Sequence, residues 1–259
     1  MLRNKVREIT KSKEIKNLWD KKAQNFPRFG EFKDEDNIIF EYFSKDGEIW
    51  KDKIVLDLGC GNGRYGLFFA TLAKKVYMLD ISPKMLENVA NDAKKFGFNN
   101  IEILCYDWSD FEPKDLNVDI IFTSLTPALN NFENFKKAYT LAKEAMFYVG
   151  WGRVRESKIL NEVFKSHNNN QVVLPNGAEF VCECLSKMNA KIPEIKYITK
   201  EITHQKPLQK AILDISWQLE AHGIKPDLEI IQKIIKDYTK DGITKYTTKM
   251  ENGLLYIQK

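Results

Sequence analysis

The sequence predicts an α/β fold: a doubly wound, mostly parallel sheet of seven strands, with helices before it and a helical insertion near its end. Two observations support this fold class. Short apolar runs of strand length alternate with segments whose apolar residues recur at helical spacing. The first run leads directly into a glycine cluster at residues 59–63, as a strand does when it turns into a helix. A length of 259 residues suits one such elaborated domain.

Residues 1–45 are predicted to form an N-terminal helical cap, followed by the main domain over residues 46–259. Ile15, Leu18 and Trp19 recur at helical spacing, and Pro27 ends that segment. A second helical stretch covers residues 36–43.

Five strands are then expected, because each apolar run is short and continuous, which is typical of parallel strands buried on both faces. They cover residues 53–58, 75–80, 101–106, 118–123 and 145–149. The helices between them are predicted over residues 64–73, 84–96 and 132–142.

The last third of the chain is less regular. Helices are predicted over residues 157–164 and 178–188, and a sixth strand over residues 194–202. Two further helices, 208–221 and 228–238, form the predicted insertion over about residues 205–242. The final segment, 244–258, alternates around Asn252-Gly253, which is compatible with a single strand or with a hairpin.

The composition restricts the kind of protein. Apolar residues make up 43% of the chain, enough for a proper core. A net charge of +4, from 40 basic and 36 acidic residues, gives no strong reason to expect a nucleic-acid or membrane partner. No apolar stretch approaches the roughly 20 residues that span a bilayer, and no secretory signal is recognisable. The four cysteines form no Cys-x-x-Cys pair, which favours reduced thiols, a cytoplasmic location and no metal site.

The glycine cluster is the main functional signal. Gly59, Gly61 and Gly63 follow a strand and precede a helix, so a ligand can lie directly on the backbone. The pattern Gly-x-Gly-x-x-Gly at Gly61, Gly63 and Gly66 would also suit a dinucleotide. However, Asp57 precedes the first glycine by two residues, and an acid there favours a ligand that carries cations over one with two phosphates. The alternative role for this acid is to cap the glycine turn.

Acidic residues also end the next two strands. Asp80 ends the second strand, where a carboxylate can accept hydrogen bonds from both hydroxyls of a ribose. It could instead cap the following helix, although Ser82 suits that role better. Asp107 and Trp108 follow the third strand, where they could bind and frame an adenine. Alternatively, Asp107 is a turn residue and Trp108 a core aromatic.

Taken together, these motifs resemble those of the class I S-adenosylmethionine-dependent methyltransferases, whose fold is Rossmann-like. The resemblance covers about residues 14–150 and depends on 57–63, 79–82 with the following Pro83-Lys84-Met85-Leu86, and 106–108. Residues 19–26 are similar to the N-terminal helix that closes over the cofactor in many members. The resemblance implies S-adenosylmethionine as cofactor, with the three loop glycines at its methionine end, Asp80 at the ribose and Asp107 at the adenine. The predicted cofactor-binding residues are Asp57, Gly59, Cys60, Gly61, Gly63, Asp80, Ile81, Asp107, Trp108, Ser124, Trp19 and Phe26.

The methyl acceptor is much less defined. Methyl transfer from a sulfonium is an in-line displacement that depends mainly on alignment, so the sequence need not show a catalytic residue, and none is assigned. The segment 123–130 lacks the Asn/Asp-Pro-Pro-Tyr/Phe motif typical of enzymes that methylate nucleic-acid bases. Trp151 and Arg153, after the fifth strand, are the candidates for acceptor binding.

A cleft covered by the N-terminal helices and the insertion favours a small-molecule acceptor. Three alternatives stay open: an NAD(P)-dependent oxidoreductase, an RNA- or protein-modifying methyltransferase, and a binding protein without turnover. The sequence does not indicate an oligomeric state.

Overall fold

A computed structural model describes residues 13–31, 34–43, 48–168 and 176–259 of the chain. These residues form two compact units. The first comprises residues up to 150, with 176–196 and 253–259, and the second comprises 151–168 and 197–252. The chain passes between the units inside strands, so a strand can belong to both.

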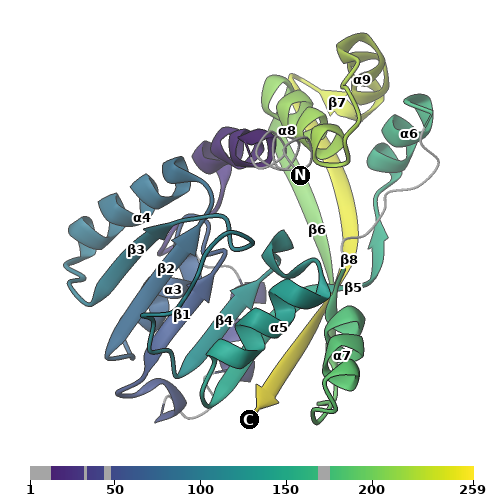
Figure 1. The fold of residues 1–259 in the computed structure, drawn as a ribbon. Helices are drawn as coiled ribbons and strands as arrows, with labels where there is room; N and C mark the ends of the chain where they lie inside the picture. The colour runs from purple at the N-terminus through teal and green to yellow at the C-terminus, as the bar shows by residue number, and fades with distance from the viewer. Residues whose placement is uncertain (1–12, 32–33, 44–47, 169–175) are drawn as a thin grey trace, which may run out of the picture. The chain divides into compact units, whose positions relative to one another are not determined.

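The strands of the sheet follow the order β3-β2-β1-β4-β5-β8-β6, and a short strand, β7, pairs with β8 (Figure 1). The neighbouring pairs β1–β2, β2–β3, β1–β4 and β4–β5 are parallel, whereas β7–β8 is antiparallel. The predicted mostly parallel, doubly wound sheet is therefore confirmed. The first five strands are β1 (Ile54–Leu58), β2 (Lys75–Asp80), β3 (Ile101–Cys105), β4 (Ile120–Ser124) and β5 (Ala145–Glu156).

The chain order reverses at β1, which lies between β2 and β4. Open α/β sheets bind ligands at the carboxyl ends of the strands beside such a point. The central strands are apolar throughout because both of their faces are covered: Leu56, Met78 and Ile121 are completely buried. The helices of the first unit are α2 (Asp34–Phe43), α3 (Arg64–Phe69), α4 (Pro83–Phe96), α5 (Phe132–Leu141) and α7 (Ala178–Lys187).

The N-terminal part of this unit is helical over residues 13–22, with a 3-10 turn, η1 (Ala23–Asn25), directly after it. A further turn, η2 (Glu48–Trp50), leads into β1. Helix α3 is four residues shorter than the sequence predicts. The amide of Thr71 bonds to the carbonyl of Phe68, three residues back, so the chain tightens and turns towards β2.

The second unit contains α6 (Lys158–Ser166), β6 (Lys196–Pro207), α8 (Leu208–Ala221), α9 (Leu228–Ile235), the turn η4 (Lys236–Tyr238), β7 (Thr239–Lys240) and β8 (Ile243–Gln258), apart from the ends of β6 and β8 that lie in the first unit. Its apolar core is formed by residues of α6, α8 and α9, together with Tyr246. Helices α8 and α9 lie between β6 and β8 in the chain, as predicted. The division into a cap over residues 1–45 and a main domain stays a prediction.

Strands β5 and β6 run further than predicted, and β6 continues to Pro207 instead of ending at residue 202. Strand β5 continues to Glu156 instead of ending at residue 149. A Cβ at Gly152 would come within 2.7 Å of the Glu251 side chain, so the glycine allows β8 to approach closely instead of ending the strand. The final segment is one strand and not a hairpin, and Asn252 is only 2% exposed. Within the part of the chain that is described, no helix is long and apolar enough to cross a membrane.

Candidate functional site

The glycine loop joins β1 to α3 in a conformation that only glycines adopt easily. Gly59, Gly61 and Gly63 have φ values of 75°, 54° and 77°, all in the left-handed region. The amides of Gly59 and Cys60 donate to the carbonyl of Leu79 at 2.8 and 3.0 Å, which fixes the loop to the end of β2.

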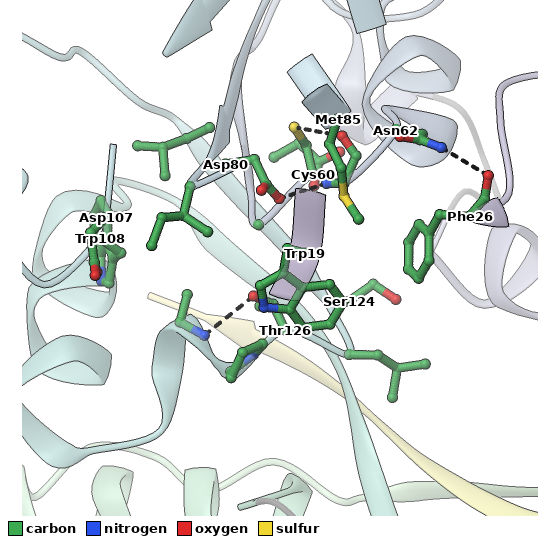
Figure 2. Close-up of a pocket in the computed structure, with 18 of the residues that line it drawn as sticks. Trp19, Phe26, Cys60, Asn62, Asp80, Met85, Asp107, Trp108, Ser124 and Thr126 are labelled. Carbon is green, nitrogen blue, oxygen red and sulfur yellow. Dashed lines mark hydrogen bonds between the residues drawn. The ribbon is translucent and has the colours of Figure 1, made fainter. Parts of the chain in front are cut away.

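Asp80, at the end of β2, holds the next part of the loop (Figure 2). One carboxylate oxygen accepts the amide of Gly61 and the other accepts the amide of Ser82, both at 2.9 Å. Burial raises the pKa of Asp80, and these amides oppose the rise because they stabilise the charged form. The carboxylate is therefore fixed in orientation, and each oxygen keeps lone-pair capacity for a further donor.

Asp57, on β1 beneath the loop, is 2% exposed. Its Oδ2 has no hydrogen-bond partner among the described residues. Burial raises the pKa of Asp57 to about 8, the negative charge of Asp80 adds to the rise, and the amide of Gly66 opposes it. A buried carboxyl oxygen without a hydrogen-bond partner is costly, so this position fits a ligand that supplies a cation or an N–H group to Oδ2.

The N-terminal segment is attached to the loop through Asn62. The side-chain amide of Asn62 donates to the carbonyls of Ala23 and Phe26 at 2.9 and 2.8 Å, and the second of these bonds is drawn in Figure 2. Trp19 and Phe26 pack edge to face, with ring centroids 6.2 Å apart. Both aromatic residues line the same pocket as the loop.

Two further contacts attach this segment to α4. Asp20 accepts the hydroxyl of Ser82, the residue that caps α4, at 2.6 Å. Arg28 binds the carboxylate of Asp92 with distances of 2.7 and 2.8 Å to the two oxygens. Buried bonds and a bidentate ion pair hold a segment more firmly than exposed contacts, so residues 19–28 form a fixed wall of the pocket.

The opposite end of the pocket is formed by the loop after β3. The carboxylate of Asp107 accepts a hydrogen bond from the amide of Ser109 at 2.9 Å. This bond forms the local turn that was the alternative role for Asp107. Trp108 is 2% exposed and donates its ring N–H to the carbonyl of Asn134 at 3.0 Å. Trp108 thus belongs to the core and also lines the pocket. Lys137 donates to the carbonyl of Trp108 and fixes the loop.

The segment after β4 completes the lining. Leu125 has a φ of 48°, an uncommon conformation for a branched residue and one that concentrates at functional sites. Thr126 accepts the amide of Ala128 at 3.2 Å, and a Cβ added to Gly59 would overlap its side chain. The loop after β1 and the segment after β4 therefore touch, which requires a glycine at position 59.

One pocket brings together nearly all the predicted cofactor residues. The predicted residues that line it are Asp57, Gly59, Cys60, Gly61, Asp80, Ile81, Asp107, Trp108, Ser124, Trp19 and Phe26. Gly63 does not line it and instead precedes the first turn of α3. The sequence analysis missed several lining residues, among them Ile15, Asn62, Arg64, Tyr65, Met85, Tyr106 and Asn134. Asn62 could have been found, because it lies inside the glycine motif, but Asn134 reaches the pocket only through folding.

The candidate acceptor residues lie elsewhere. Trp151 and Arg153 belong to the second unit and do not line this pocket of the first unit. Their role in acceptor binding stays a prediction. Among the described residues lining the pocket there is no histidine, lysine or glutamate. The described part of the chain also contains no cluster of three or more metal-binding side chains.

Comparison with known proteins identifies the family. A methyltransferase-domain model matches residues 49–220, which is more than half of the chain. The chain belongs to this methyltransferase-domain family, and the predicted resemblance to the class I S-adenosylmethionine-dependent methyltransferases is confirmed. This result favours a methyl donor over NAD(P), the oxidoreductase alternative.

The relatives are distant and match only part of their length. An uncharacterized protein of Haemophilus influenzae is 27% identical over 126 residues, 48% of this chain and 46% of that protein. An uncharacterized RNA methyltransferase of Oceanobacillus iheyensis is 35% identical over 65 residues, 25% of this chain and 14% of that protein. The matched regions thus span less than half of these relatives.

Solved structures agree in fold. The YcgJ protein of Bacillus subtilis has a TM-score of 0.51 at 15% identity, with 84% of this chain and 98% of that chain covered. A protein of Bacillus halodurans C-125 has a TM-score of 0.54 at 16% identity, with coverages of 83% and 98%. At these identities the likeness concerns the fold alone.

Proposed function

We propose that the pocket of the first unit binds S-adenosylmethionine and that the methyl group passes to a small-molecule acceptor. The observation that carries the cofactor assignment is the pair of buried carboxylates at the glycine loop, of which Asp57 has an oxygen without a partner within the described residues. A ligand with an ammonium group and a ribose supplies donors to both carboxylates, whereas a pyrophosphate would add negative charge beside them. The residues present therefore fit this cofactor.

In this proposal the chain's own residues bind and orient. Asp80 accepts hydrogen bonds from ribose hydroxyls, Asp107 accepts from the adenine amino group, and Asp57 faces the methionine end. When bound, S-adenosylmethionine supplies an electrophilic methyl group on its sulfonium. The described lining contains no histidine, lysine or glutamate, and its three aspartates are assigned here to the cofactor. Alignment and exclusion of water are therefore the protein's main contributions in this proposal.

The small-molecule assignment is supported by the wall that residues 19–28 form over the glycine loop. A pocket closed on one side by Trp19 and Phe26 suits a small acceptor better than a polymer. The RNA- and protein-modifying alternatives are outcomes of the test below, because named relatives include an RNA methyltransferase and a protein-L-isoaspartate O-methyltransferase.

Calorimetric titration tests the cofactor assignment. At pH 7, Asp57 is mostly protonated, since its pKa is about 8, and binding of a cation beside it should release close to one proton. Titrations in two buffers of different ionisation enthalpy measure this release for S-adenosylmethionine, with NAD as the comparison ligand. Asp57→Asn should bind without the release. Tighter binding of NAD than of S-adenosylmethionine would contradict the assignment.

Methyl transfer into a size-fractionated cell extract tests the acceptor. Label from S-adenosylmethionine is expected in the low-mass fraction. Label that stays with macromolecules and disappears after ribonuclease or protease treatment would replace the small acceptor by RNA or protein.

A further inference from the structure

Two arginines of strand β5 lie in the second unit. Arg153 and Arg155 are separated by one residue, so the alternation of a strand places both side chains on one face. Their surroundings differ in a way that the sequence does not reveal.

Arg153 is held in place while most of it remains accessible. Its Nε lies 3.3 Å from an Oε1 of Glu251, which also accepts the backbone amide of Arg153 at 2.9 Å. Its guanidinium lies over the ring of Tyr197, 4.1 Å from the centroid. The Arg153 side chain is nevertheless 57% exposed, whereas that of Glu251 is only 8% exposed. The buried partner thus orients an exposed cation.

Arg155 is bound much less completely. Its Nη2 donates to the side-chain oxygen of Gln218 at 2.7 Å, and Gln218 carries no charge. Its Nε is buried and has no hydrogen-bond partner in the part of the chain that is described. Two carboxylates of the same unit are engaged with other cations: Asp214 with Lys206, and Glu251 with Arg153.

A desolvated guanidinium without an anion is unfavourable. Burial lowers the pKa of Arg155, but arginine stays protonated in proteins and cannot escape the cost by releasing its proton. Buried charges in proteins are ordinarily paired or hydrogen-bonded, because an unpaired buried charge destabilises the fold. The neutral amide of Gln218 offsets only part of this cost.

We propose that Arg153 and Arg155 form an anion-binding site for the carboxylate or phosphate group of a small molecule. A guanidinium matches both groups because it presents parallel N–H donors to two oxygens. The exposed, oriented Arg153 meets the ligand first, and the ligand supplies the anion that Arg155 lacks. An RNA backbone fits less well, since it needs an extended row of exposed cations and here only one of the two arginines is largely exposed. The site lies within the second unit alone and does not depend on the proposed cofactor pocket.

Nuclear magnetic resonance of the arginine Nε–H groups tests this site directly. The full chain, labelled with ¹⁵N-arginine, is titrated with sodium phosphate and, separately, with sodium acetate, at constant ionic strength. The Arg155 signal, identified by its loss in Arg155→Lys, should shift and saturate at millimolar anion. The arm with the lower half-saturation concentration identifies phosphate or carboxylate as the preferred group. Arg28, which is paired with Asp92, provides the reference signal. An Arg155 signal that shifts no more than the Arg28 signal would overturn the proposal.

Thermal unfolding gives an independent measurement. The Tm of the wild type should rise with the better anion, because a ligand that binds only the folded state stabilises it. Arg155→Met should fold without the anion, since it removes a desolvated charge, and should lose that rise. Lys245→Met, which removes a charge from an exposed position of β8, is the matched control and should keep it. An equal rise in wild type and Arg155→Met, or displacement of phosphate by a much lower concentration of an RNA oligonucleotide, would refute the site.

Discussion

Each unit of the molecule buries one ionisable side chain that the described residues leave incompletely hydrogen-bonded, Asp57 in the first unit and Arg155 in the second, but the two side chains respond differently. Asp57 of the first unit can take up a proton, and burial raises its pKa to about 8. Arg155 of the second unit has no comparable neutral form and keeps its charge. Without a ligand, Asp57 can therefore be buried in its neutral form, whereas Arg155 stays charged. The buried charge of Arg155 therefore destabilises the fold until an anion binds. Changes in pH should reveal the first site, and added anions the second.

The largest expected effect concerns the free energy of unfolding of Asp57→Asn as a function of pH. Because the pKa of Asp57 is raised from 3.8 to about 8, its protonated form stabilises the fold at low pH. This contribution is present below pH 3.8 and is lost as the pH rises through 8. The slope is up to about 1.4 kcal/mol per pH unit, so the loss amounts to several kcal/mol.

Urea unfolding from pH 5 to 8 measures this effect. The stability of Asp57→Asn relative to the wild type should increase with pH, since the amide cannot ionise. Asp119→Asn removes a β1-binding carboxylate whose Oδ2 accepts the amide of Ile54, and it serves as the comparison. A constant difference between Asp57→Asn and the wild type across this range would show that Asp57 is ionised in the fold and would break the contrast with Arg155.

The sequence predicted the fold of the first unit well because its signals are local. The apolar runs predicted the strands, and the glycine cluster together with Asp80 predicted the centre of the pocket. Contacts between segments that are distant in the chain produce no comparable pattern in the sequence. Asp20 reaches Ser82 across 62 positions, and Asn62 binds the carbonyls of Ala23 and Phe26. Such pairs depend on tertiary packing, which a single sequence does not encode in a readable pattern.

The second unit was predicted less well for a related reason. The fifth strand was predicted to end at residue 149, whereas it continues to Glu156 and includes Gly152, where the Glu251 side chain of β8 comes close. The sequence analysis named Arg153 from its position alone, and the shared strand face of Arg153 and Arg155 became visible only with the full length of β5. Only their partners, Glu251 for one and Gln218 for the other, distinguish an ordered exposed cation from an incompletely satisfied buried one.

A smaller effect is expected at the glycine loop. Gly61→Ala places a Cβ at a φ of 54° and 3.0 Å from the ring of Phe26. The left-handed backbone alone costs about 1–2 kcal/mol, and the contact disturbs the wall of the pocket as well. We expect S-adenosylmethionine to bind at least about tenfold more weakly, which corresponds to about 1.4 kcal/mol.

Gly97→Ala is the control for Gly61→Ala. Gly97 has a φ of 77° at the end of α4, and a Cβ there would meet nothing within 4 Å. Both variants should lose stability in urea because both place a Cβ at positive φ, but only Gly61→Ala should lose affinity in calorimetric titration. Equal affinities in the two variants would mean that the Phe26 wall does not shape the cofactor pocket.

The smallest expected change in the free energy of unfolding is that of Arg153→Ala. This variant removes the exposed, oriented arginine and leaves the buried Arg155 in place. Burial alone would raise the pKa of Glu251, but the hydrogen bonds and positive charge of Arg153 outweigh it and keep that pKa below its usual value of 4.5. This pair therefore stabilises the fold at neutral pH, and its contribution disappears as the pH falls through the lowered pKa. Since Arg153 is 57% exposed and Glu251 keeps the backbone amide, the loss should be at most about 1 kcal/mol at pH 7. Urea unfolding at pH 7 and pH 3 measures it, and a loss that is equally large at pH 3 would assign the effect to the stacking on Tyr197 instead of the ion pair.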